Sequence, residues 1–348
     1  MFFAIIGPIS AGKRTIANYL VENHQFKEIY LQHNNVDNEL VNFTSNNIND
    51  YGKKNLIEKE ILKNDNLIVF DDTQKLLDFV TSNWNKNYVL YSECISSDLL
   101  LLRKRPTFLL ISVNAPVTQR YQRYKESFNN NSNNDSKNIL SFEEFCKLDD
   151  IQMFDRGLNS LMNKSDLKIE NVCKSINEFY SLLEEKDLTR FERLRPSWDT
   201  YFMTLSFLSA RRSNCMKRKV GCILTKNHYI ISTGYNGTPR NIANCYEGGC
   251  PRCNSNASMG TQLDLCLCLH AEENALLEAG RGKANGATLY CNTCPCIGCT
   301  IKIIQSGIIE VVYALEYRHD EYIKELFKQA GVKIRKYNNV DYNYLFNF

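Results

Sequence analysis

The chain has 348 residues, a length typical of two domains, and its 43% hydrophobic and 23% charged content fits a folded protein with a substantial core. Its formal net charge is only +3, so composition gives no reason to expect polymeric nucleic acid or a membrane surface as a partner. No apolar run approaches the roughly 20 residues that cross a bilayer, and the apolar start, Phe2 to Ile6, is too short for the core of an export signal. We therefore expect a cytoplasmic protein, with a nuclear location also open.

The 14 cysteines are unevenly placed along the chain. Cys94, Cys146 and Cys173 are spread over the first half, whereas all the others crowd between Cys215 and Cys299. A secreted disulfide framework would normally accompany a short chain and an export signal. The cysteines therefore indicate a reducing compartment and thiolates that bind metal.

Residues 1–185 are predicted to form an α/β domain built on a parallel sheet, because apolar runs alternate with helical stretches. A helix is expected over Lys13–Glu22 and a flexible loop over the Asn-rich run Asn129–Asn138. The charged stretch 186–195 is interpreted as a linker. The expected strands are Met1–Ile6, Leu67–Phe70, Tyr88–Leu90 and Thr107–Val113.

A phosphate-binding loop (P-loop) is predicted directly after the first strand. The sequence GPISAGKRT fits the pattern G-x-x-x-x-G-K, with Gly7, Gly12 and Lys13 at the fixed positions. In this pattern backbone N–H groups surround phosphate oxygens and the lysine reaches them. The hydroxyl residue that usually follows the lysine comes one position later, as Thr15, an order that resembles the nucleotide and deoxynucleotide monophosphate kinases.

That resemblance suggests roles for further residues of the domain. VFDD, Val69–Asp72, could supply a carboxylate for Mg²⁺, and Arg120 and Arg123 look like the lid arginines of such kinases. Three interpretations stay open: an active kinase, an inactive domain that binds a nucleoside triphosphate effector with Mg²⁺, and a degenerate scaffold.

Residues 196–348 are predicted to form a second domain, an α/β/α sandwich. Apolar residues at helical spacing predict an opening helix over Trp198–Arg212. A cysteine-rich irregular segment then follows the first two strands and ends at Cys268. The other expected elements are the helices His270–Ala279, Ile297–Gln305 and Asp320–Gln329 and the strands Val220–Leu224, Tyr229–Thr233, Ala287–Cys291 and Ile309–Tyr313.

Two short motifs in this domain predict a catalytic zinc site. HAEEN begins at His270, and PCIGC carries Cys296 and Cys299 at the start of a helix, so that both sulfurs fall on one face. One imidazole and two thiolates leave the fourth position of tetrahedral zinc open for water. The alternative is a purely structural zinc site, in which all four ligands come from the protein.

Glu272 gives the site a proton shuttle. It lies two residues from His270 and can reach the water without binding the metal. Zinc lowers the pKa of water to about 7, and a glutamate there can take the proton and return it to a ring nitrogen and a leaving amine. H-x-E together with P-C-x-x-C is the pattern of zinc-dependent base deaminases.

The second domain resembles the deoxycytidylate (dCMP) deaminases, in particular the fungal form with an N-terminal extension. The resemblance covers about residues 195–337 and implies a cytidine-deaminase-like fold, zinc at His270, Cys296 and Cys299, and a proton shuttle at Glu272. It also implies hydrolysis of dCMP to dUMP and ammonia, which supplies dUMP for thymidylate synthesis. The segments that carry it are PSWDTYFM from Pro196, RSNCMKRKVGC from Arg212, GYNGTPRNIANC from Gly234, EGGCPRC from Glu247, CLCLHAEENALLEAGR from Cys266 and LYCNTCPCIGC from Leu289.

Three further residues are candidates for binding the substrate. The resemblance implies that Asn236 contacts a sugar hydroxyl, although an asparagine here could also serve only the turn. Arg212 could hold the 5′-phosphate through two parallel hydrogen bonds, or it could be a solvated surface arginine. The backbone N–H of Ala271 lies in the first turn of a helix and is a candidate donor to the base carbonyl.

The resemblance also implies a second, structural zinc. Cys215, Cys245 and Cys250 match cysteines that bind such an ion in related phage and bacterial enzymes. Cys253, Cys266 and Cys268 compete for the fourth place, and Cys268 is preferred because it lies just before the active-site helix. Buried cysteines without metal are the alternative.

Regulation and assembly are implied in the same way. The dCMP deaminases are homo-oligomers, here expected as a hexamer, activated by dCTP and inhibited by dTTP. Arg281 occupies the position of an effector contact, unless it only complements the C-terminal end of its helix. A tRNA or nucleoside deaminase of the same superfamily, a bifunctional deaminase and kinase, and a non-enzymatic nucleotide-binding regulator are the rival functions.

Overall fold

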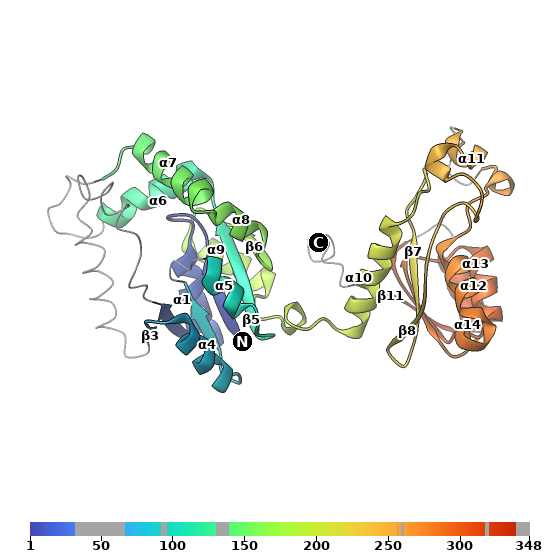
Figure 1. Ribbon diagram of the computed structural model, residues 1–348, viewed down its shortest axis with the longest axis horizontal. Helices are drawn as coiled ribbons and strands as arrows, with labels where there is room; N and C mark the ends of the chain where they lie inside the picture. The colour runs from blue at the N-terminus through green and yellow to red at the C-terminus, as the bar shows by residue number, and fades with distance from the viewer. Residues whose placement is uncertain are drawn as a thin grey trace. The chain divides into compact units, whose positions relative to one another are not determined.

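The computed structural model describes residues 1–31, 67–91, 96–129, 139–255, 257–258, 261–316 and 320–338. The chain divides into two compact units, Met1–Arg195 and Pro196–Phe348 (Figure 1). The stretch 186–195, predicted as a linker, belongs to unit 1, because Leu188 is buried in the core of that unit. Cys94 and almost all of the Asn-rich run lie outside the described residues. Within the described part of the chain, no helix combines the length and the apolar character that crossing a membrane requires.

Unit 1 is built on a parallel sheet, as predicted, with the strand order β3-β2-β4-β1-β5-β6. The strands β2 and β6 were not predicted, because each is short and mixes apolar with charged residues. The strands are β1 (Phe2–Ile6), β2 (Lys27–Leu31), β3 (Ile68–Phe70), β4 (Tyr88–Leu90), β5 (Phe108–Asn114) and β6 (Leu167–Glu170).

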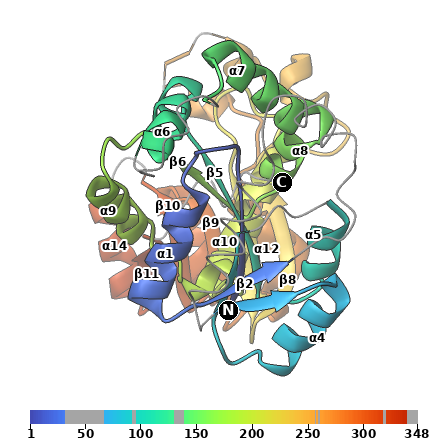
Figure 2. The same cartoon turned by 90° about the vertical axis from the view of Figure 1, so that its left-hand side faces the viewer.

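Both faces of this sheet are covered by helices, which explains why its strands are continuous apolar runs. Phe3 and Ile5 of β1 pack toward α1 and α9, whereas Phe2, Ala4 and Ile6 pack toward α4, α5 and α8 (Figure 2). The helices are α1 (Lys13–His24), α4 (Thr73–Ser82), α5 (Ser96–Leu102), α6 (Val117–Asn129), α7 (Phe142–Asp150), α8 (Leu158–Asn163) and α9 (Ile176–Lys186), with a π-helix over Ile151–Asp155 and a 3-10 helix over Phe191–Arg193.

Unit 2 is a three-layered α/β/α sandwich around a mixed sheet in the order β11-β10-β9-β7-β8. The strands β9, β10 and β11 are parallel, and β7 pairs antiparallel with β8 and β9. The strands are β7 (Gly221–Lys226), β8 (Tyr229–Tyr235), β9 (Thr288–Thr293), β10 (Glu310–Leu315) and β11 (Lys333–Lys336).

The layers follow from the alternation of side chains along the strands. Ile223 of β7 packs with α10 (Trp198–Arg211) on one face. Cys222 and Leu224 pack on the other face with α12 (Ala271–Ala284), α13 (Ile297–Gln305) and α14 (Asp320–Gln329). The segment between β8 and α12 contains only short elements, the 3-10 helices Cys245–Glu247 and Leu263–Leu265 and α11 (Pro251–Asn254).

Ionic contacts fix the start of α10 to the far edge of the sheet. Arg335 of β11 donates two hydrogen bonds to Asp199, at 2.6 and 2.8 Å, and the hydroxyl of Tyr290 donates a third at 2.8 Å. The hydrogen bonds from Arg335 hold the pKa of Asp199 below its ordinary value. Asp199 of the PSWDTYFM segment therefore serves the fold.

Two glycines allow helices to approach the sheet of unit 2 closely. A Cβ atom at Gly234 of β8 would lie 2.0 Å from the carbonyl oxygen of Ala271 and 2.6 Å from the nitrogen of Ala275, both in α12. Gly221 of β7 approaches the backbone of α10 in the same way. Backbone atoms cannot turn aside as a flexible side chain can. Gly234 therefore fixes how closely the first turn of α12 lies against β8.

We expect Gly234→Ala to destabilise unit 2 by about 1–3 kcal/mol, because the added methyl group overpacks this contact. Urea denaturation of the full chain in a Trp84→Phe background, in which fluorescence reports Trp198 of unit 2 alone, measures the effect. Gly282→Ala is the matched control, since no heavy atom lies within 4 Å of a Cβ there, and it should leave stability equal or slightly higher. Equal denaturation midpoints for Gly234→Ala and wild type would contradict this account.

Candidate active site

The three predicted zinc ligands come together at the N-termini of two helices. His270 is the N-cap of α12, Cys296 is the N-cap of α13, and Cys299 lies in the first turn of α13. The Nδ1 atom of His270 lies 3.3 Å from the Sγ of Cys299 and 3.4 Å from the Sγ of Cys296. All three ligand atoms lie within 4.8 Å of one another.

These separations fit a zinc ion. With zinc–nitrogen distances of about 2.0 Å and zinc–sulfur distances of about 2.3 Å, a tetrahedral site places nitrogen and sulfur about 3.5 Å apart. His270 is exposed and Cys299 is buried, so the set opens toward solvent on the imidazole side. Three ligands from the protein are the number found in catalytic rather than structural zinc sites.

The ionisation of these groups also suits metal binding. Hydrogen bonding to Cys299 lowers the pKa of the Cys296 thiol to about 4, and His270 acts in the same direction. The hydrogen bond between His270 and Cys296 raises the pKa of His270 to about 9. These contacts favour the thiolate form of Cys296, which is the form that binds metal, and zinc binding would displace the proton on His270.

Glu272 lies beside this set on the sheet side of α12 and is only 4% exposed. Burial raises its pKa to about 7, while its own backbone N–H and the charge of His270 oppose the rise. A carboxyl group that titrates near neutral pH can both accept and return a proton. Its burial and position agree with the shuttle role expected from the sequence.

The last two residues of HAEEN have structural tasks that sequence reasoning missed. Glu273 accepts a hydrogen bond from the backbone N–H of His270 at 2.7 Å and forms an ion pair with Lys302 of α13. Asn274 donates to the carbonyl of Tyr235 at 2.7 Å. The capping-box spacing could have revealed the first contact, but the second joins segments far apart in the sequence. Together they hold α12 to α13 and to the end of β8.

The side chain of Asn236 is engaged in the turn after β8. Its Oδ1 accepts hydrogen bonds from Ser213 Oγ at 2.7 Å and from the N–H of Val220 at 2.8 Å. Its Nδ2 donates to the carbonyl of Arg218 at 2.8 Å. An amide nitrogen carries two hydrogens, so Nδ2 can donate to a second acceptor. Asn236 thus orders the turn, and a sugar contact would use that second hydrogen.

The remaining predicted residues lie on the surface or in helix turns. Arg212 is exposed at the C-cap of α10, and its neighbour Ser213 bonds Asn236. Ala271 is fully buried in the first turn of α12. Arg281 is exposed in the last turn of α12, after a break in helical geometry at Gly280.

The cysteine-rich segment brings six sulfurs together. Cys215, Cys245 and Cys268 are grouped as expected, but the fourth member of their group is Cys253. Cys250, which the sequence placed with them, belongs to an overlapping group. Cys250 is the N-cap of α11, and Cys253 lies about one turn later within that helix. The second group consists of Cys250, Cys253, Cys266 and Cys268.

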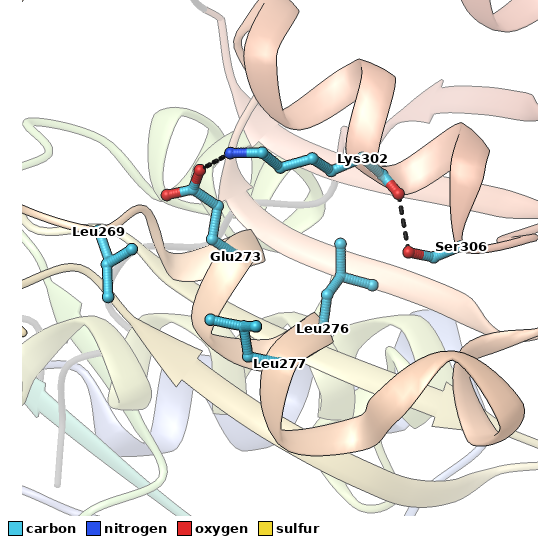
Figure 3. A pocket seen from close by; sticks show the side chains of 6 residues that line it. All are labelled: Leu269, Glu273, Leu276, Leu277, Lys302 and Ser306. Atoms are coloured by element: carbon cyan, nitrogen blue, oxygen red, sulfur yellow. Dashed lines mark hydrogen bonds and ion pairs between the residues drawn. The ribbon is translucent and has the colours of Figure 1, made fainter. Parts of the chain in front are cut away.

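A pocket of about 300 Å³ lies on the outer side of α12, between α12 and α13 (Figure 3). Leu269, Leu276 and Leu277 give it an apolar floor, and Lys302 spans its rim to reach Glu273. Ser306 donates to the carbonyl of Lys302 at 2.7 Å. The residues that line this pocket are distinct from Glu272 and the three ligands.

Comparisons with known proteins place the chain in a family. Residues 196–315 match the model of the cytidine and deoxycytidylate deaminase zinc-binding region. The deoxycytidylate deaminase of Schizosaccharomyces pombe is 40% identical over 337 residues, which cover 96% of each chain. The chain belongs to the deoxycytidylate deaminase family.

Two further relatives were found. The deoxycytidylate deaminase of Saccharomyces cerevisiae is 43% identical over 280 residues, covering 77% of this chain and 86% of that protein. The solved dCMP deaminase of the cyanophage S-TIM5, in complex with dCMP and dUMP, is 33% identical, with 39% of this chain and 94% of that chain covered at a TM-score of 0.32. The yeast matches extend into unit 1 of this deaminase, whereas the family model lies within unit 2.

In unit 1, the predicted phosphate loop joins β1 to α1. Gly7 lies so close to β5 that a Cβ would meet the carbonyl of Val113 at 2.2 Å, and Gly12 has a φ of +112°. Lys13 Nζ donates to the carbonyls of Gly7 and Pro8 at 2.7 and 3.0 Å. Thr15 lies in the first turn of α1, partly buried. Both glycines are therefore required by the backbone.

The other residues of unit 1 that the sequence likened to those of kinases have contacts within the fold. Asp71 and Asp72 follow β3, which two strands separate from β1, so they lie about 14 Å or more from the loop. Asp72 instead caps α4. Arg120 forms a buried ion pair with Asp149 at 2.6 Å, and Arg123 donates to the carbonyl of Cys173 at 2.9 Å. Both arginines hold α6 to its neighbours.

We expect Glu272→Gln to lower the turnover of dCMP by about 10²–10⁴-fold, because glutamine cannot accept and return a proton. Zinc content, measured by mass spectrometry, should not change. Glu273→Gln is the matched control: its amide oxygen can still cap α12, so turnover should stay within a few-fold of wild type. Similar losses in both variants would show that Glu272 acts through the fold and not through proton transfer.

Proposed function

We propose that the protein hydrolyses dCMP to dUMP and ammonia at a zinc ion held by His270, Cys296 and Cys299. The observation that carries this proposal is the burial of Glu272 against a set of three ligands, in a chain of the deoxycytidylate deaminase family. The reaction consumes one water molecule, breaks the bond between C4 and the exocyclic amine, and forms a carbonyl. The dUMP formed would serve thymidylate synthesis.

The chain's own groups account for the proton transfers. Zinc, when bound, acts as a Lewis acid that lowers the pKa of a water molecule to about 7. Glu272 would accept the first proton that the water loses and donate it to ring nitrogen N3. It would then take the second proton from the hydroxyl added at C4, as the carbonyl forms, and deliver it to the departing amine. The backbone N–H of Ala271 lies in the first turn of α12, where it can donate to the base carbonyl.

Substrate recognition rests on the loop between α10 and β7 and on the turn after β8. The hydrogen bonds from Ser213 and Val220 hold Asn236 with Nδ2 able to meet a sugar hydroxyl. Arg212 is adjacent to Ser213 and can bind the 5′-phosphate through its guanidinium. Specificity for a nucleotide over a nucleoside would then depend on Arg212.

A structural zinc ion is the second metal of the proposal. Cys215, Cys245, Cys253 and Cys268 form a complete set of four thiols, with Cys253 in place of the expected Cys250. Structural zinc contributes about 10–16 kcal/mol of folding free energy in zinc-finger peptides. That is sufficient to order a segment without an apolar core.

Regulation by dCTP and dTTP and assembly into a hexamer complete the proposal. Arg281 is exposed and available to an anionic effector. Leu277 of α12 and Ile301 of α13 are 72% and 60% exposed, and Leu267 is 45% exposed. A contact with further copies of the chain could cover these side chains.

For unit 1 we propose binding of a nucleoside triphosphate or another phosphate anion at the loop, without rapid phosphoryl transfer. The loop at the carboxyl end of β1 leads into the N-terminus of α1, where free N–H groups and the helix dipole favour an anion. Asp72 caps α4, and Arg123 donates to the carbonyl of Cys173. Arg120 reaches the loop carbonyl of Ile9 at 3.5 Å but is neutralised by Asp149. The site would therefore bind and not catalyse.

Turnover of dCMP, deoxycytidine, CMP and a tRNA anticodon stem–loop by the full chain tests the substrate. We expect dCMP to be preferred, and Arg212→Gln to lower kcat/KM for dCMP by about 10-fold or more while leaving deoxycytidine unaffected. Arg211→Gln, at the neighbouring exposed arginine, is the control. A loss shared by both substrates would remove the phosphate role, and preference for the tRNA would favour the rival editing function.

Calorimetric titration of the full chain with ATP tests unit 1. We expect Lys13→Ala to weaken binding by about 10-fold or more, because the Lys13 ammonium lies on the carbonyls of Gly7 and Pro8 within the loop. Lys27→Ala, at an exposed lysine of β2, should not weaken it. Incubation with ATP and each deoxynucleoside monophosphate should give no rapid product. No detectable binding by wild type would favour a scaffold, and turnover of a few per second would make the protein bifunctional.

A further inference from the structure

The six cysteines of the irregular segment form two overlapping groups of four. Cys215 and Cys245 belong only to the first group, and Cys250 and Cys266 belong only to the second. Cys253 and Cys268 belong to both. Within each group, all four sulfurs lie within 4.8 Å of one another.

The distances between the sulfurs match the edges of metal–thiolate tetrahedra. With zinc–sulfur bonds of about 2.3 Å, the edge of such a tetrahedron is about 3.8 Å. In the first group, Cys215 and Cys253 are 3.9 Å apart. In the second, Cys266 lies 3.9 Å from Cys250 and 3.8 Å from Cys253. The edge common to both groups, between Cys253 and Cys268, is 4.0 Å long.

One ion cannot use all six sulfurs, because structural zinc takes four ligands. An ion in the first group would leave Cys250 and Cys266 as thiols in contact with each other and with Cys253. Cys250 is fully buried. None of the cysteines in the described residues is in a disulfide. The second group is therefore a complete set of ligands with no other assigned use.

Each group also receives a backbone N–H on one of its unshared sulfurs. The N–H of Met216 donates to Cys245 at 3.5 Å, and the N–H of Leu267 donates to Cys250 at 3.4 Å. Such hydrogen bonds stabilise the negative charge of a thiolate and are typical of the surroundings of metal ligands. Each of the two groups therefore has one backbone hydrogen bond to a sulfur that it does not share.

Among the described residues of this segment, the sulfurs form a hydrophobic core of their own. Cys245, Cys250, Cys253 and Cys268 form a buried cluster of their own, with only Cys215 and Cys266 packed against it. The segment leads directly to the catalytic ligand His270, two residues after Cys268. Between them, Leu269 pairs with Gly237 through two backbone hydrogen bonds at 2.9 and 3.2 Å. A metal that orders the sulfurs would therefore also order the backbone that leads to His270.

We propose that this segment binds two divalent metal ions of the zinc type that share the thiolates of Cys253 and Cys268. Cys215 and Cys245 complete the site of one ion, and Cys250 and Cys266 complete the site of the other. Binding releases the protons of all six thiols. The inference deepens the structural zinc site proposed above and does not depend on the substrate.

Metal analysis of the purified full chain tests the cluster. We expect about three zinc ions per chain in wild type: one catalytic and two in the cluster. Cys250→Ser and Cys266→Ser should each lower the content to about two, and Cys296→Ser should also give about two by losing the catalytic ion. Cys146→Ser, at a cysteine of unit 1, is the control and should keep about three.

X-ray absorption at the zinc edge requires no variant, so it also covers the case in which a serine variant fails to fold. We expect a sulfur-rich shell and a short zinc–zinc path, which only ions that share ligands produce. A wild-type content of about two zinc ions without that path, unchanged in Cys266→Ser, would overturn the proposal and leave a single structural ion. dCMP turnover on the same samples keeps this result separate from failure of the proposed activity.

Discussion

The close contact between α12 and β8 is the constraint on which the active site depends. His270 and Glu272 both lie at the start of α12, and their depth over the sheet is set by how near the helix backbone can come to Gly234. Any side chain at that position would lift the first turn of α12 away from β8. The hydrogen bonds from Asn274 to the carbonyl of Tyr235 and from the N–H of His270 to Glu273 then fix the rotation of the helix. Gly234 therefore supports the chemistry by fixing the position of His270 and Glu272.

Unit 2 is stabilised by two kinds of core. The sandwich buries apolar side chains on both faces of its sheet, in the usual way of a layered α/β fold. The irregular segment between β8 and α12 buries sulfur instead. Thiols alone bury little apolar surface. The fold of this segment would therefore depend on metal binding. Because the segment ends two residues before His270, the structural and catalytic metal sites are neighbours along the chain.

In unit 1, the loop predicted to bind phosphate has a backbone that requires its glycines, while nearby polar groups serve the fold. Gly7 and Gly12 are fixed by close contacts and by a positive φ, and Lys13 lies across the loop. Arg120 and Asp149 neutralise each other in the interior. A buried pair of this kind is costly to break, because either partner alone would leave an uncompensated charge. Such arginines are poorly suited to moving onto a transferred phosphate.

The sequence by itself determined those features that depend on local spacing. The pattern H-x-E with P-C-x-x-C named His270, Cys296, Cys299 and Glu272, because the ligands of each motif are close in the chain and each motif opens a helix. The alternation of apolar strands and helices likewise determined the layered α/β class of both units. The bounds predicted for α13 and α14 are the bounds that the structure has.

The tertiary structure decided what depends on segments that are distant in the sequence. It separated β3 from β1, which removed the aspartates of VFDD from the phosphate loop. It turned Asn236 into the centre of a hydrogen-bonded turn, and it placed Cys253 rather than Cys250 with Cys215 and Cys245. Spacing along a chain cannot rank six cysteines in an irregular segment, because no repeating geometry relates their positions. Only the folded backbone brings particular sulfurs within bonding distance of one metal.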